Sequence, residues 1–360
     1  MLTEPLHEAP LTSTKAISAG RPQDALLSKM DLSLRQIYNP LGYSVEIITN
    51  DPKILTAADD SFGHIRTARE STSLQIHIGV SYRPRAECPP EPTRREYNHL
   101  YSLVADAENQ ALLDLATGAN FTWITNVTVR NKLYLRYNFL EKTVYLLLGA
   151  SVVTDIHAAC VSKHGKGILL CGQSGAGKST LAYACARVGW SYTSDDTCYI
   201  INNSELTTVI GHCHRARFRP SARALFPELK SFSLTPRMEG KPSIEVPTDA
   251  LPIQCTAPEA AIFCIVFLRR FSGATVNLVQ LSRGTATHRL CGDLFSAGEI
   301  RSKHEKILER LWNIPTFDLQ YDSLDEGIQA LDLLSSETAI PSSDKNPFVE
   351  TNRVSTGRER

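Results

Sequence analysis

The pattern of apolar and polar positions changes near residue 150. Before that point, apolar residues alternate with polar ones over 74–80 and again over 133–139, and this period of two predicts half-buried strands. After it, the order becomes strand, glycine turn, strand, glycine-rich loop, helix and strand. We therefore expect an α/β protein whose first part is an α+β domain.

The length of 360 residues suits about two domains of ~150 residues each. Residues 1–38 and 339–360 are rich in small polar residues without a sustained period, which predicts flexible tails. Between them we expect an α+β N-terminal domain over 39–148 and an α/β domain over 149–338. The proline-rich segment 83–97 predicts an exposed loop.

Charge and composition exclude several classes of protein. The chain has 38 Lys and Arg against 38 Asp and Glu, so it lacks the global positive field of a non-specific nucleic-acid binder. No apolar run approaches the ~20 residues of a membrane span. The N-terminus lacks a signal-peptide pattern, and the nine cysteines contain no C-x-x-C pair. We expect a cytoplasmic protein with no nucleic-acid or membrane partner.

The clearest motif is G-Q-S-G-A-G-K-S from Gly172 to Ser179, which fits G-x-x-x-x-G-K-[ST] between an apolar run and a helix-forming run. Its backbone N–H groups are expected to bind phosphate oxygens, with Lys178 at the β/γ-phosphates and Ser179 on Mg²⁺. The motif thus predicts ATP or another nucleoside triphosphate with Mg²⁺. The expected binding residues are Gly172, Gln173, Ser174, Gly175, Ala176, Gly177, Lys178, Ser179 and Thr180.

Two features near this loop can supply catalytic groups. Asp195 and Asp196 follow a predicted short strand, where they can provide a Mg²⁺ ligand and a base for a hydroxyl; the alternative is a solvated turn. His164-Gly165 predicts a two-residue hairpin turn, and the resulting register places His157 opposite Gly172. His157 can then orient a carboxylate or stabilise a phosphoryl group; the alternative is a strand histidine bonded to backbone.

These residues resemble the C-terminal domain of HPr kinase/phosphorylase. The resemblance rests on the run H-A-A-C-V-S-K-H-G-K-G-I-L-L-C-G-Q-S-G-A-G-K-S that starts at His157, and on G-W-S-Y-T-S-D-D ending at Asp196. It implies a P-loop core similar to that of phosphoenolpyruvate carboxykinase. It also implies that Asp196 is the base that takes a seryl proton, that Asp195 lies beside it near the metal, and that His157 is the partner of Asp196. Lys178 would bind the phosphates, and Ser179 would be a Mg²⁺ ligand.

The resemblance ends soon after residue 201. The family's E-I-R-G-L-G segment is replaced by G-H-C-H-R-A-R-F-R-P over 211–220, and its R-P-G-R segment is absent. These departures predict a changed acceptor site. In the replacement, Arg215, Arg217 and Arg219 alternate, which predicts either a positive stripe for an anion or a solvated strand edge. His212 and His214 are not expected to hold zinc, since no second ligand pair is evident.

The sequence therefore predicts an ATP-dependent kinase that transfers the γ-phosphoryl group to a hydroxyl of an unknown protein serine or small molecule. A homo-oligomer is compatible with the resemblance. Two alternatives stay open, an ATP-binding sensor without phosphotransfer and a simple ATPase. Placement of His157 and Asp196 beside the loop would favour catalysis, and an Asp196 that points away would favour sensing.

Overall fold

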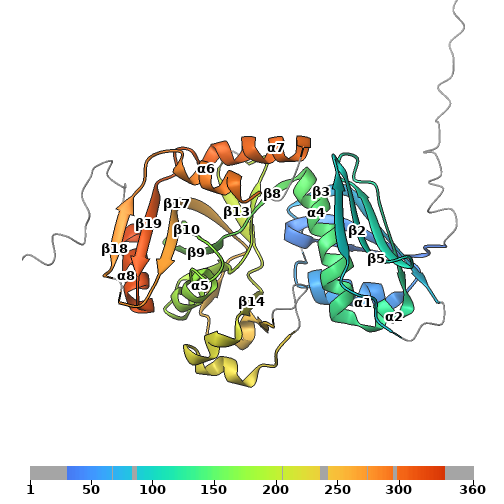
Figure 1. Cartoon of the computed structure of the whole chain (residues 1–360), viewed down its shortest axis with the longest axis horizontal. Helices are drawn as coiled ribbons and strands as arrows, with labels where there is room; N and C mark the ends of the chain where they lie inside the picture. Colours follow the sequence, from blue (N-terminus) through green and yellow to red (C-terminus); the bar gives the residue numbers. More distant parts are fainter. Residues whose placement is uncertain are drawn as a thin grey trace, which may run out of the picture.

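The computed structural model describes residues 31–66, 68–82, 87–204, 206–235, 242–273, 275–294 and 298–336. They form two large sheets that lie side by side, each covered by helices (Figure 1). Most of the two predicted tails lies outside the described residues. Residues 34–38 were predicted to belong to the first tail, but they form a strand paired with its neighbour, so that boundary was wrong by several residues.

The first sheet is built from the first third of the chain, with seven strands among the described residues in the order β1-β2-β3-β7-β6-β5-β4. β2, β3 and β7 are parallel and the other pairs are antiparallel. The strands are β1 (Leu34–Tyr38), β2 (Tyr43–Thr49), β3 (Glu70–Ser81), β4 (Thr93–Tyr97), β5 (Leu100–Asp106), β6 (Asn109–Asp114) and β7 (Asn120–Thr125). β4 falls in the predicted loop 83–97; its five residues are exposed, but they pair with β5.

Helices α1 (Pro52–Phe62) and α4 (Glu141–Ser151) pack their apolar residues on this sheet. α2 (Asn126–Arg130), α3 (Lys132–Leu135) and a π-helical turn (Arg136–Leu140) lead into α4. The strand predicted over 133–139 is therefore wrong. Leu135 and Phe139 stand four residues apart and are both fully buried, which is helical rather than strand spacing.

The second sheet is mixed and has ten strands among the described residues. Eight follow the order β16-β11-β9-β10-β17-β13-β12-β8, β19 also pairs with β17, and β18 pairs with β19. They are β8 (Val153–Ile156), β9 (Ala159–Lys163), β10 (Lys166–Cys171), β11 (Ser191–Ser194), β12 (Cys198–Ile201), β13 (Thr208–Gly211), β16 (Cys255–Thr256), β17 (Glu259–Arg270), β18 (Asn277–Gln280) and β19 (Thr316–Tyr321). A separate ribbon pairs β14 (Arg215–Phe218) with β15 (Ile244–Pro247). Short 3₁₀ turns complete the chain at Pro40–Gly42, Pro220–Ala224, Pro227–Ser231, Thr248–Ala250 and Glu309–Leu311.

Helices cover both faces of the second sheet. On β10, Ile168 and Leu170 belong to the core that includes α5 (Lys178–Arg187) and α8 (Leu324–Ser336). The intervening Leu169 and Cys171 face the core of α6 (Thr285–Gly292) and α7 (Gly298–Leu308). A strand buried on both faces has a continuous apolar sequence, as β10 does.

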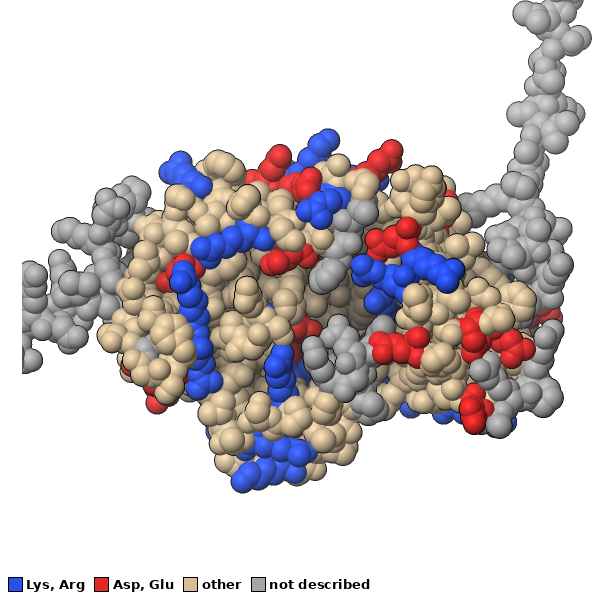
Figure 2. All heavy atoms as spheres, viewed as in Figure 1, with Lys and Arg blue, Asp and Glu red and all other residues tan. Residues whose placement is uncertain are grey.

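The mixed sheets and their helices agree with the predicted α/β class. One core cluster joins α1, α4 and the first sheet to Val153, Tyr199 and Ile210 of the second, so the two halves share buried surface. Basic and acidic side chains both occur over each half on the face that Figure 2 shows. No helix among the described residues is long and apolar enough to cross a membrane.

Candidate active site

The glycine-rich loop connects β10 to α5, in the position that its flanking sequence predicts. Gly172, Gly175 and Gly177 have φ values of 141°, 95° and 99°, which side chains rarely adopt. At Gly177, a Cβ atom would also lie 2.8 Å from the hydroxyl of Tyr321. Glycine is thus required here both by conformation and by space, and the backbone is free to approach a ligand closely.

Lys178 is the first residue of α5 and its side chain is buried beside the loop. Its Nζ atom donates a hydrogen bond to the Gly172 carbonyl at 2.7 Å and lies 3.0 Å from Nε2 of His157. Burial lowers the pKa of Lys178 and the nearby Asp196 carboxylate opposes that shift. The ammonium is therefore held at the start of the helix, where phosphate oxygens are expected.

His157 lies at the break between β8 and β9. The hairpin at His164-Gly165 is confirmed, since both residues have positive φ and Lys163 pairs with Lys166. The predicted register does not extend to His157 opposite Gly172: pairing with β10 ends at Ala159, because β8 leaves β9 and pairs with β12. His157 therefore reaches the loop from a bend, and its Nδ1 atom lies 3.6 Å from Oδ1 of Asp196.

Asp195 and Asp196 follow the end of β11. Asp195 is buried: its Oδ2 atom accepts a hydrogen bond of 2.9 Å from the Arg217 backbone N–H, and its carbonyl accepts one of 3.0 Å from Ser179 Oγ. Burial raises the pKa of Asp195 to about 6, and the neighbouring Asp196 adds to the rise. Asp196 is only partly buried, so it is the carboxylate of the pair that remains accessible to a substrate.

A cavity of about 430 Å³ brings these groups together. It is lined by His157, Ser174, Gly175, Gly177, Lys178, Ser179, Thr180, Asp195 and Asp196, and by Arg217, Arg219 and Arg270. Among the predicted binding residues, Gly172, Gln173 and Ala176 are not part of that lining. Gly172 nevertheless contacts the site through its carbonyl, which accepts from Lys178.

The donor set of this cavity fits Mg²⁺. Ser179 and Asp195 supply a hydroxyl and a carboxylate next to the loop, and Mg²⁺ in nucleotide sites is commonly held by one or two such oxygens together with substrate phosphates. Within the described part of the chain, no group of three or more His, Cys, Asp or Glu side chains is placed to hold a metal alone.

The predicted arginine stripe is divided between two roles. Arg215 and Arg217 lie on β14 and pair with Glu245 of β15 at 2.7 and 3.0 Å. β14 ends at Phe218, so Arg219 leaves the strand and donates a hydrogen bond of 2.6 Å to Ser174 Oγ in the loop. The stripe is thus neither a single anion site nor a solvated edge.

The first half of the chain also reaches this site, which the sequence pattern did not predict. Tyr137 donates a hydrogen bond to Glu245, and Glu141 of α4 lies 3.8 Å from Arg217. Because the Arg217 N–H holds Asp195, these contacts bear indirectly on the acid pair. No local motif marks Tyr137 or Glu141; they reach the site because the turn before α4, and α4 itself, lie against Arg217 of β14 and Glu245 of β15.

Comparison with known proteins bears on the same segment. A family model described as SynChlorMet cassette protein ScmC matches residues 123–211, which include His157, the loop and both aspartates. HPr kinase/phosphorylase from Chlorobaculum tepidum is 29% identical over 103 residues, and that from Pelodictyon phaeoclathratiforme is 31% identical over 97. The chain has an HPr kinase-like relationship.

The relationship covers a limited part of the molecule. The matched segments span 28% and 27% of this chain, and the chain spans 28% of the length of each of these two curated relatives. Among solved structures, the Hpr(Ser) kinase/phosphatase from Coxiella burnetii matches with a TM-score of 0.28 at 13% identity, over 50% of this chain and 97% of that one.

Proposed function

We propose that this protein is an ATP-dependent phosphotransferase that moves the γ-phosphoryl group to a hydroxyl. The observation that carries the proposal is the line of groups from Lys178 through His157 to Asp196, with separations of 3.0 and 3.6 Å. A phosphate-binding cation and a candidate base are thereby held in one cavity beside the glycine-rich loop. The HPr kinase-like relatives support the same class of reaction.

In the proposed reaction, the loop and Lys178 bind the nucleotide phosphates, and Arg219 and Arg270 add positive charge to the cavity. The Asp196 carboxylate takes the proton of the acceptor hydroxyl. The hydroxyl oxygen forms its bond to the γ-phosphorus while the bond from that phosphorus to the leaving ADP oxygen breaks. Mg²⁺, when bound, would neutralise phosphate charge next to Ser179 and Asp195.

The fold that we propose for residues 149–338 is a P-loop core of the HPr kinase and phosphoenolpyruvate carboxykinase-like type, with residues 39–148 as the second unit. The position of the glycine-rich loop between β10 and α5 supports this, as do the curated relatives. The loop residues 172–180 are the proposed nucleotide site, and Asp196, His157, Lys178 and Asp195 the proposed catalytic groups.

Purified protein incubated with γ-labelled ATP, Mg²⁺ and a cell extract tests this function. We expect label to appear on an extract component, and an Asp196→Asn variant to lose about 10²–10⁴-fold in transfer rate while it keeps its ATP affinity. A Lys178→Ala variant should lose ATP binding, whereas exposed Lys230→Ala should not. ATP binding without transfer would contradict the proposal and favour a nucleotide sensor; release of phosphate alone would favour an ATPase.

A further inference from the structure

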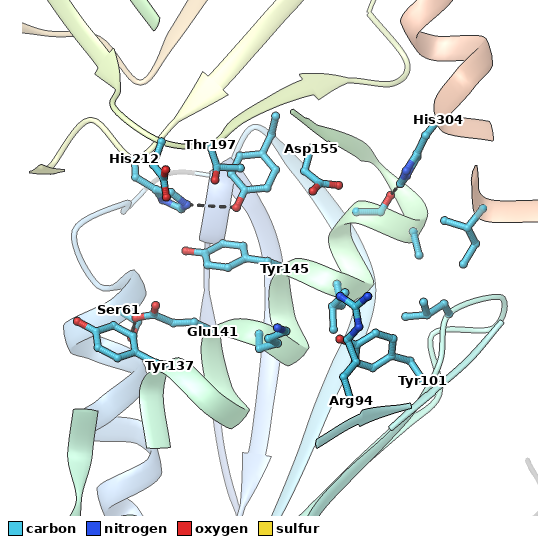
Figure 3. Close-up of a pocket in the computed structure, with 18 of the residues that line it drawn as sticks. Ser61, Arg94, Tyr101, Tyr137, Glu141, Tyr145, Asp155, Thr197, His212 and His304 are labelled. Atoms are coloured by element: carbon cyan, nitrogen blue, oxygen red, sulfur yellow. Dashed lines mark hydrogen bonds between the residues drawn. The ribbon is translucent and has the colours of Figure 1, made fainter. Parts of the chain in front are cut away.

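A second cavity, of about 470 Å³, lies between the two halves of the chain and is lined by residues of both sheets. Figure 3 shows Tyr145 of α4 in its middle, with His212 and Thr197 on one side and Glu141 and Tyr137 on the other. Its volume is in the range of sites that enclose small organic molecules. The function proposed above uses no group at the far side of this cavity.

The second cavity adjoins the phosphate cavity. Asp195, Asp196 and Arg217 line both of them, so these three residues form a shared wall. In phosphoryl transfer, the attacking oxygen and the leaving oxygen approach the phosphorus from opposite sides, roughly in line. A molecule in the second cavity can therefore place a hydroxyl at the candidate base Asp196, next to the nucleotide in the phosphate cavity, as an acceptor must.

The lining combines aromatic rings with balanced charge. The rings of Tyr145 and His212 are 5.0 Å apart and those of Tyr145 and Tyr199 are 5.7 Å apart. Burial lowers the pKa of His212 to about 4, so its imidazole is neutral near pH 7. Four basic residues line the cavity, Arg94, Lys142, Arg215 and Arg217, against the five acids Glu96, Glu141, Asp155, Asp195 and Asp196.

This balance disfavours a highly charged ligand. Arg215 and Arg217 already pair with Glu245, and Glu141 accepts hydrogen bonds from Arg136 and Ser61 at 2.8 Å. Aromatic rings with interspersed polar groups instead suit a molecule that has an apolar face and several hydroxyls. A serine on a folded protein carries its hydroxyl one carbon from the backbone, so reaching Asp196 by this route would require the partner's backbone inside the cavity.

We infer that the second cavity is the acceptor site, and that it takes an uncharged, hydroxyl-bearing small molecule of sugar-like or cyclitol-like chemistry. The inference rests on the proposed phosphotransferase function and names its acceptor class. The acceptor hydroxyl lies against Asp196, which removes its proton as the bond to the γ-phosphorus forms and ADP leaves.

A variant that fills the cavity tests this inference. Gly149 is a buried residue of α4 that lines the cavity, and a Cβ atom there would make only an ordinary contact, 4.0 Å from Asp155 Oδ1, so Gly149→Leu can project its side chain into the cavity. The matched control is Gly292→Leu on α6, where a Cβ atom has nothing within 4 Å and which does not line the cavity. Both changes remove a helical glycine, so both variants should fold.

Each protein is incubated with γ-labelled ATP and Mg²⁺ in two assays. One contains glucose, mannose, myo-inositol and the low-molecular-mass fraction of a cell extract; the other contains the protein fraction. We expect label on a small molecule, a loss of roughly tenfold or more in Gly149→Leu at unchanged ATP affinity, and no loss in Gly292→Leu. Label must appear on a neutral hydroxyl compound for the acceptor class to hold.

The remaining outcomes separate the two proposals. Label on protein alone, on a charged small molecule, or on a small molecule at equal rates in Gly149→Leu and the unmodified chain overturns the acceptor-site inference and leaves the phosphotransferase standing. Absence of label from both fractions while ATP binds overturns the phosphotransferase, and the acceptor site with it.

Discussion

Nε2 of His157 lies 3.0 Å from Nζ of Lys178, so one ring nitrogen faces the phosphate-binding lysine. A lysine ammonium can only donate, so Nε2 accepts whenever Lys178 is charged. Nδ1 is the atom that faces Asp196. The histidine thus joins the candidate base to the phosphate-binding lysine, with one nitrogen directed at each.

Removal of the imidazole should lower the turnover number more than the affinity for ATP. We expect His157→Ala to reduce kcat for phosphoryl transfer by about 10–100-fold with little change in KM for ATP, because Asp196 loses its orienting partner. Steady-state kinetics measures both constants. His157→Gln, which restores a hydrogen-bonding group, should recover part of kcat; an unchanged kcat in His157→Ala would rule out the positioning role.

Gly177→Ala should disrupt the loop. The residue has φ of 99° and its new Cβ would meet the Tyr321 hydroxyl, so we expect a loss of about 1–3 kcal/mol in stability together with weaker ATP binding. Thermal unfolding and nucleotide titration measure these effects. Gly292→Ala is the control in open space. Adding Tyr321→Phe should recover only part of the loss, since the strained φ remains; full recovery would show that the clash alone matters.

Glu245 should contribute strongly to stability, because it pairs with both Arg215 and Arg217. Burial raises its pKa, but the two guanidinium groups outweigh that and hold the pKa below its usual value. We expect Glu245→Gln to cost about 3 kcal/mol, measured by urea unfolding, since it leaves partly buried arginines unpaired. Glu305→Gln, which breaks a more exposed pair with Arg301 on α7, should cost about 0.5 kcal/mol or less. An equal loss of stability in Glu245→Gln and Glu305→Gln would contradict the strong contribution expected of Glu245.

Stability should fall as the pH drops below 6.5. Burial, aided by Arg217, lowers the pKa of His212 from 6.5 to about 4, so folding favours its neutral form. The contribution of the neutral His212 to the free energy of unfolding is complete above pH 6.5 and is lost as the pH falls toward 4. We expect this free energy to fall by about 1–2 kcal/mol between pH 7 and pH 5. Unfolding curves across this range should flatten for His212→Gln but not for His288→Gln, an exposed site on α6. If the pH dependence of stability were the same in His212→Gln and the unmodified protein, His212 would not be its cause.

Local turn chemistry was predictable from the sequence. His164-Gly165 specifies a tight hairpin, and its register followed directly because both residues take positive φ. The segment 133–139 was predicted as a strand, although it is helical, because Leu135 and Phe139 fall on one face of either a strand or a helix. The side chain of Asn131 accepts from the Tyr134 N–H and caps the helix there, a contact that decides between the two patterns.

The loop and the acid pair were identifiable because their residues are close in sequence and the chemistry requires those types at that spacing. The contact between Glu245 and Tyr137 could not be identified from the sequence, since neither residue belongs to a motif and they stand 108 positions apart. What joins them is the pairing of β14 with β15 and the packing of α4 against the second sheet. Such long-range contacts leave no local signature.

The contacts of Tyr137 and Glu141 also limit how the chain can be divided. These two residues precede residue 149, yet they touch the Arg217–Glu245 pair whose strand holds Asp195 in place. A fragment cut at that boundary would contain every residue of the glycine-rich loop and both aspartates, but not the side chains that fix β14 from outside. The segment that carries the sequence motif is therefore shorter than the part of the chain that builds the site. Moving the motif alone into another protein would transfer an incomplete site.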